Sequence, residues 1–75
     1  MEEKIIAIFS QISGISPELL NAQTRVRDTG VNSVIIIRII VNIEQEFGIE
    51  FEDEELDYSR IVLLEDLFNF VRNKL

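Results

Sequence analysis

The amino-acid sequence predicts an all-α fold: a small four-helix bundle of three longer helices and one short helix, in a single domain over residues 1–75. Two observations predict it. Three segments of the chain place apolar residues at the 3.6-residue period of a helix with one buried face. Apolar residues make up 47% of the sequence, which is ample for one packed core, while 75 residues leave no room for a second.

The first helix is expected over residues 2–13. Two glutamates in its first turn suit the positive end of the helix dipole, and Gly14 is a natural stop. A long connection then runs to Asn32, with a short helical turn predicted where Ser16 precedes Pro17. The apolar face of the first helix is formed by Ile5, Ile8, Phe9 and Ile12.

The second helix is expected over residues 33–47, although its Ile/Val run could also suggest a strand. The segment is too long for a typical strand and contains no turn residue. Asn32 can cap its start and Gly48 can end it. At helical spacing, the residues that face inward are Ile36, Ile39, Ile40, Ile43 and Phe47.

A short third helix is expected over residues 53–60, held to the core by Phe51 and Leu56. The last helix is expected over residues 64–75, and the basic residues near its end suit the negative pole of the helix dipole. Its apolar face consists of Leu64, Leu67, Phe68, Val71 and Leu75.

The second helix is also apolar on its opposite side, where Val34, Ile37 and Val41 lie beside Arg38 and Gln45. A chain this small cannot wrap the helix completely, so we expect these three residues to form an exposed apolar stripe. We call Val34, Ile37 and Val41 the apolar stripe, with Ile35 at its flank. Such a patch indicates a protein-binding surface, and a homodimer seam or a fully covered core helix are the alternatives.

The chain has no cysteine and no histidine. It therefore has no thiolate nucleophile, no Ser-His triad, and neither of the ligands that zinc sites use most. We do not expect an enzyme. The sequence also has no signal peptide after Met1 and no apolar run long enough to span a membrane, which predicts a cytoplasmic protein.

The net charge is -7, and the acidic residues are concentrated in one segment. This segment would repel nucleic acid and attract a basic partner, or it is simply a solvated face that keeps the protein soluble. Calcium binding is not favoured, because residues 50–57 lack the spaced ligands and central glycine of an EF-hand. The acidic block consists of Glu44, Glu46, Glu50, Glu52, Asp53, Glu54, Glu55 and Asp57.

Ser33 stands at the first turn of the second helix, at one end of the apolar stripe. Its hydroxyl is expected to be exposed beside backbone N–H groups that have no partner within the helix, at the positive end of the dipole. That position favours a phosphate group. A serine after an asparagine is more often a capping residue than a modified one, so the residues alone predict only a serine able to carry a phosphate ester.

Residues 30–34, GVNSV, resemble the Gly-x-Asp-Ser-Leu motif of acyl carrier proteins, whose serine receives 4′-phosphopantetheine. The resemblance extends over nearly the whole chain, through its length, its acidity and the order of its helices. It is carried further by IEQEFGIEF at 43–51, DEEL at 53–56 and LFNFV at 67–71.

The chain also departs from the family pattern. Asn32 replaces the motif aspartate, and Val34 replaces the leucine. Ile35 and Arg38 occupy positions that are often acidic in fatty-acid carriers, and Leu63 stands where many members begin the last helix with Ser or Thr. These differences make the partner surface more similar to that of peptidyl or polyketide carriers.

The resemblance implies that Ser33 bears a covalent 4′-phosphopantetheine, taken from coenzyme A, that holds acyl or aminoacyl groups as thioesters. The implied pathway is of the fatty-acid, polyketide or non-ribosomal-peptide type, and the implied partners are a phosphopantetheinyl transferase and the enzymes that load and process the cargo. We expect a monomer. A carrier-like module that is never modified and serves as a scaffold is the alternative, because Asn32 lacks the motif's charge. The residues expected to bind partners are Val34, Ile35, Ile37, Arg38 and Val41.

Overall fold

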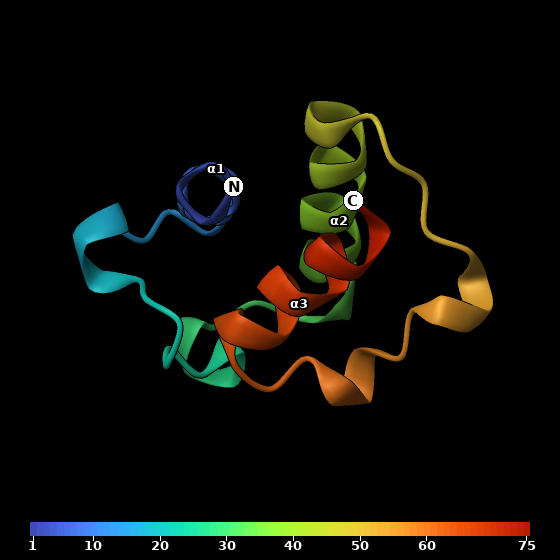
Figure 1. Cartoon of the computed structure of the whole chain (residues 1–75). Helices are drawn as coiled ribbons and strands as arrows, with labels where there is room; N and C mark the ends of the chain where they lie inside the picture. The colour runs from blue at the N-terminus through green and yellow to red at the C-terminus, as the bar shows by residue number, and fades with distance from the viewer.

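The protein is described by a computed structural model that covers residues 1–75, apart from the side chain of Asp53. The described chain contains three α-helices: α1 (Glu2–Ser13), α2 (Ser33–Phe47) and α3 (Leu64–Lys74). Figure 1 views α1 end-on, while α2 runs upright in the picture, so the axes of these two helices cross. The first connection, residues 14–32, and the second connection, residues 48–63, pass on opposite sides of the helices in this view.

The starts and ends of α1 and α2 confirm the sequence predictions. Both helices end at a glycine with a left-handed backbone, a conformation in which a side chain would be strained. Gly14 has a φ of 79° and its N–H donates to the carbonyl of Ser10 over 2.9 Å. Gly48 has a φ of 64° and its N–H bonds to the carbonyl of Glu44.

The core lies between the three helices and receives side chains from both connections. The predicted inward positions of α2 are buried, with Phe47 partly buried against them. In α1, Ile5 and Phe9 are fully buried, while Ile8 and Ile12 are partly buried. The buried side chains are Ile5, Phe9, Leu20, Val26, Ile36, Ile39, Ile40, Ile43, Phe51, Ile61, Leu64, Leu67, Phe68 and Val71.

The first connection is fixed by hydrogen bonds to the segment that begins α3. The N–H of Val26 donates to the carbonyl of Val62 over 2.9 Å, and the N–H of Leu64 donates to the carbonyl of Thr24 over 3.0 Å. The N–H of Glu65 likewise donates to the carbonyl of Ala22. The bonds from Leu64 and Glu65 satisfy N–H groups of the first turn of α3 that have no partner within the helix. They also hold in place the chain that leads to α2.

The predicted short third helix over residues 53–60 is wrong. The structure has two separate 3₁₀ turns there, η3 (Asp53–Glu55) and η4 (Tyr58–Arg60). The carboxylate of Asp57 accepts the N–H of Ser59 over 3.1 Å, a local bond that competes with helical pairing. Phe51 is nevertheless buried, and Leu56 packs against the core as expected.

Two further details differ from the sequence prediction. Leu75 does not extend the apolar face of the last helix, because α3 ends at Lys74 and the Leu75 side chain is exposed. The turn after Ser16 is a three-residue 3₁₀ turn, η1 (Pro17–Leu19), and the Ser16 hydroxyl donates to the carboxylate of Glu18. A fourth 3₁₀ turn, η2 (Val26–Thr29), comes just before α2.

Candidate functional site

Ser33 is the first residue of α2 and its side chain is exposed. The preceding residue, Asn32, has an extended backbone and caps the helix: its Oδ1 accepts the N–H of Ile35 over 2.9 Å. This is the N-cap that the sequence predicts. The cap fixes the direction in which the chain enters the helix, and therefore holds the Ser33 hydroxyl at the helix end.

The start of α2 provides an environment suited to a phosphate group. The N–H of Ile36 donates to the backbone carbonyl of Asn32. The N–H of Ile35 donates to the side-chain oxygen of Asn32. The N–H groups of Ser33 and Val34 belong to the first turn, where a helix offers no internal acceptor. The first turn of α2 contains no acidic residue. Backbone N–H donors and the helix dipole thus favour a negatively charged group here, and no carboxylate on this turn repels it.

The chain approaches Ser33 through a tight turn. The hydroxyl of Thr29 donates to the carbonyl of Val26 over 2.5 Å, closing η2. Gly30 follows with a φ of 79°, a left-handed conformation that glycine adopts without strain. The side chain of Val31 then packs partly buried against the core. Buried residues on both sides of the turn, Val26 and Ile36, therefore anchor the exposed serine.

The two faces of α2 differ as the sequence predicts. The apolar stripe is exposed, with 64% of Val34, 45% of Ile37 and 42% of Val41 accessible to solvent. The opposite face, by contrast, contains the buried isoleucines of the core. The alternative of a helix covered on all sides by its own chain is therefore wrong. Ile35 is half-buried at the flank of the stripe, and Arg38 is exposed beside it.

An open hollow of about 300 Å³ lies where α2 meets the second connection. Val41 lines it, so the hollow continues the apolar stripe toward the end of the helix. The carboxylate of Glu44 accepts the N–H of Phe51 over 2.8 Å and holds the connection beside α2. The sequence did not predict this hollow, because a contact between a helix residue and a loop residue seven positions later has no periodic signal. Its lining residues are Val41, Glu44, Gln45, Ile49, Glu50 and Phe51.

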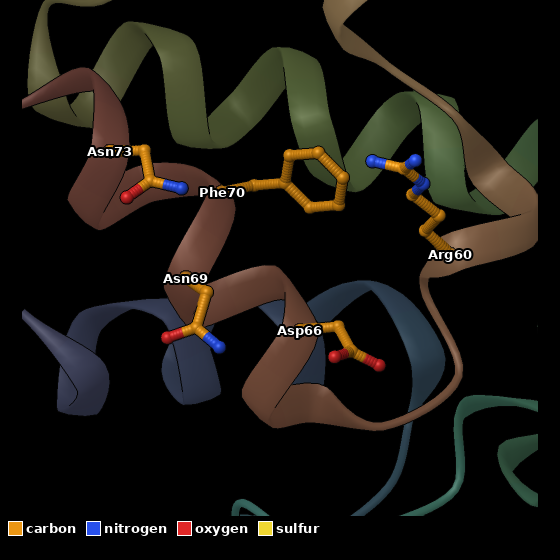
Figure 2. A pocket seen from close by; sticks show the side chains of 5 residues that line it. All are labelled: Arg60, Asp66, Asn69, Phe70 and Asn73. Atoms are coloured by element: carbon orange, nitrogen blue, oxygen red, sulfur yellow. The ribbon is translucent and has the colours of Figure 1, made fainter.

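A second hollow, of about 210 Å³, lies between α3 and η4. In Figure 2 the ring of Phe70 and the guanidinium of Arg60 extend toward one another, with Asn69 and Asn73 along the helix. Asp66 also lines it, but its carboxylate accepts the N–H groups of Val62 and Leu63. Ser33 does not line this hollow, and we assign no part of the site to it.

The acidic block is partly neutralised by a residue that sequence reasoning did not consider. The ammonium of Lys74 lies 2.7 Å from the carboxylate of Glu55, and both side chains are about one third exposed. The hydrogen bond from Lys74 lowers the pKa of Glu55 and in turn raises the pKa of Lys74. Glu46 is paired with Lys4 over 3.3 Å. The side chain of Asp53, which the sequence places in the same block, lies outside the described residues.

Among the described residues, no group of three acidic side chains is placed to hold a metal ion. None of the helices in the described chain is long and apolar enough to cross a membrane.

Comparison with known proteins gives a consistent result. The sequence pattern of the family described as "Phosphopantetheine attachment site" matches residues 3–68. An acyl carrier protein of Nitratidesulfovibrio vulgaris is 33% identical over 75 residues, which is 99% of this chain and 96% of that protein. An acyl carrier protein of Rickettsia bellii is 32% identical over 73 residues, which is 96% of this chain and 88% of that protein.

The matched region contains nearly all of α1, the whole of α2 with Ser33 at its start, and the beginning of α3. The relatives are similar over almost their whole length, so the likeness is not confined to a short motif. The chain belongs to the acyl carrier protein family, and its role is that of a phosphopantetheine carrier.

Proposed function

We propose that Ser33 is the residue that carries the 4′-phosphopantetheine of this protein. The observation that supports it is the position of Ser33: an exposed hydroxyl at the first residue of a capped helix, inside the region that matches the family. Ser33 and Val34 supply first-turn N–H groups to the phosphate, and Asn32 keeps the turn in place.

Attachment joins the Oγ of Ser33 to the phosphorus that coenzyme A bears on its pantetheine side. The bond to the adenosine bisphosphate half breaks, that half leaves with the electron pair, and the hydroxyl proton passes to a base of the transferase. The chain has no histidine, the side chain that most often acts as a general base, and the transferase supplies this group in our proposal. The group, once bound, supplies the thiol that holds acyl or aminoacyl cargo as a thioester.

The partner surface that we propose is the outward side of α2, next to Ser33. The apolar stripe is exposed, and apolar residues in a contact that excludes water contribute to binding even when they add little to the fold. The partners are a phosphopantetheinyl transferase and the loading and processing enzymes of a fatty-acid, polyketide or peptide pathway. The protein acts as a cytoplasmic, single-domain monomer. The binding residues are Val34, Ile35, Ile37, Arg38 and Val41.

Intact-mass measurement after incubation with coenzyme A and a broad-specificity transferase tests the attachment site. We expect the addition of one phosphopantetheine, abolished by Ser33→Ala. Ser16→Ala is the matched control, since it removes another exposed serine at the start of a turn and is expected to change nothing. Addition to a serine other than Ser33 would refute the assignment.

The unmodified scaffold is the alternative function, and Asn32 is the observation that favours it. Its amide caps α2 as an aspartate would, but carries no charge for a transferase to recognise. If several transferases modify Asn32→Asp and leave the natural protein unmodified, the alternative is correct.

A further inference from the structure

The charge of this protein changes sign around the proposed attachment site. Residues 19–43, which include η2, Ser33 and most of α2, contain three arginines and one aspartate, a local net charge of +2. Since the whole chain carries -7, the remaining residues carry -9. The arginines are Arg25, Arg27 and Arg38, and the aspartate is Asp28.

These arginines also differ from the other basic residues in their pairing. Each of the four remaining basic side chains lies within 4.0 Å of a carboxylate. Among the side chains that the structure describes, Arg25, Arg27 and Arg38 form no such ion pair, and all three are exposed. Their guanidinium groups are therefore not engaged in an ion pair with a described side chain and are available to a partner. The paired side chains are Lys4 with Glu46, Arg60 with Asp57, Arg72 with Glu2 and Lys74 with Glu55.

The three arginines belong to the two elements that surround Ser33. Arg25 immediately precedes η2 and Arg27 lies within it, and three residues separate this turn from α2. Arg38 lies on α2 next to Ile37, and between Ser33 and Val41 it is the only charged residue in the sequence. In Figure 1, the chain runs from η2 to the lower end of α2, where the helix begins, and the start of α3 lies between the two in this view. The exposed apolar stripe thus has Arg38 beside it and two further arginines in the turn that precedes Ser33 in the chain, while the acidic block begins at Glu44, near the other end of the helix.

We propose that the partner enzymes of this carrier dock on α2 with a surface that is apolar at its centre and acidic at its rim. This inference rests on the proposed role of Ser33 and adds the charge of the partner. A surface with acidic side chains is attracted by the three arginines, whereas a basic surface is repelled from the start of α2 and drawn toward residues 44–57. The net negative charge of the whole chain would predict a basic partner, whereas the arginines near Ser33 indicate that the partner surface that docks there is acidic.

Two synthetic amphipathic helical peptides test this. They share the same leucines on one face and carry either glutamates or lysines on the other. Each is titrated into ¹⁵N-labelled protein, unmodified and modified at Ser33, and binding is followed by amide chemical shifts. We expect the glutamate peptide to shift the signals of the apolar stripe and Arg38, more weakly as salt rises. We expect the lysine peptide to shift residues 44–57.

Charge reversal provides the matched comparison. Arg38→Glu and Arg27→Glu should each lower the affinity for the glutamate peptide roughly threefold or more, because an attraction is replaced by a repulsion. Arg60→Glu changes the net charge equally but lies in η4, and should leave the affinity nearly unchanged.

The proposal is overturned if the lysine peptide prefers the stripe, if neither peptide binds there, or if the arginine variants and Arg60→Glu behave alike. Shifts of the stripe that depend on the concentration of the protein itself would show that a second copy covers α2, which also overturns it. The titration is also made on unmodified protein. A result that overturns the docking proposal can therefore be distinguished from a failure of attachment at Ser33.

Discussion

At the scale of single residues, Ile37 and Ile39 give the sharpest test of the two faces of α2. Ile39 is fully buried, whereas Ile37 is 45% exposed. Ile39→Ala is expected to lower the free energy of unfolding by about 2–5 kcal/mol, because it leaves a cavity in the core. Ile37→Ala should cost less than about 1 kcal/mol and act on partner binding instead. Urea unfolding of both variants measures this, and an equal loss would mean that α2 is buried on both sides in solution.

Asn32 combines a structural role with a lost charge, and two substitutions separate them. Asn32→Ala removes the oxygen that accepts the N–H of Ile35, and should cost about 1 kcal/mol of stability. Asn32→Asp keeps the cap, so its thermal midpoint should change little. If transferases use the motif carboxylate as a charge handle, Asn32→Asp should also be modified faster by a housekeeping transferase. An unchanged rate would show that the lost charge does not limit recognition.

At the scale of elements, the carboxylate of Asp66 holds the chain that enters α3. Asp66 accepts the N–H of Val62 over 3.0 Å and that of Leu63 over 2.9 Å, a role that the leucine at the cap position cannot fill. Asp66→Ala is therefore expected to lower the free energy of unfolding by about 1 kcal/mol. Glu65→Ala is the control, because it removes another acidic residue from the same turn. If denaturant unfolding shows that both variants lose the same free energy of unfolding, Asp66 acts only through the helix dipole and its two hydrogen bonds contribute nothing.

At the scale of the whole molecule, the pair between Glu55 and Lys74 ties the second connection to the end of α3. Because folding lowers the pKa of Glu55 below its usual 4.5, the pair stabilises the protein above that pH, and this is lost as the pH falls through the folded value. Folding raises the pKa of Lys74 above 10.5, so its share is lost as the pH rises through that higher value.

We therefore expect Glu55→Gln to lower the thermal midpoint at neutral pH, with the difference from the natural protein vanishing at acid pH, where the carboxyl is protonated in both states. Glu54→Gln, in the same block, should leave the midpoint unchanged or raise it, since it relieves repulsion in a chain of net charge -7. Moderate salt should also raise the midpoint of the natural protein. If the two variants melt alike, the contact with Lys74 contributes nothing in solution.

The sequence by itself determined the parts of this protein that depend on residues close together in the chain. The bounds of α1 and α2 follow from the helical period and from the glycine that ends each helix, and Asn32 is the cap that its residue type predicts. The inner and outer faces of α2 follow from the same period, because the helix geometry decides which side chains share a face. The GVNSV motif could likewise be read directly as a resemblance to carrier proteins.

Only the tertiary structure decided the features that join distant segments. Residues 53–60 form two 3₁₀ turns rather than a helix, although the sequence correctly predicted that Phe51 and Leu56 contact the core. The first connection meets the start of α3 through the bond from Val26 to Val62, and Lys74 meets Glu55. These contacts join residues far apart in sequence, and they form only because folding of the core brings their segments together. The chain leading to Ser33 is therefore held in place by contacts that the sequence does not reveal.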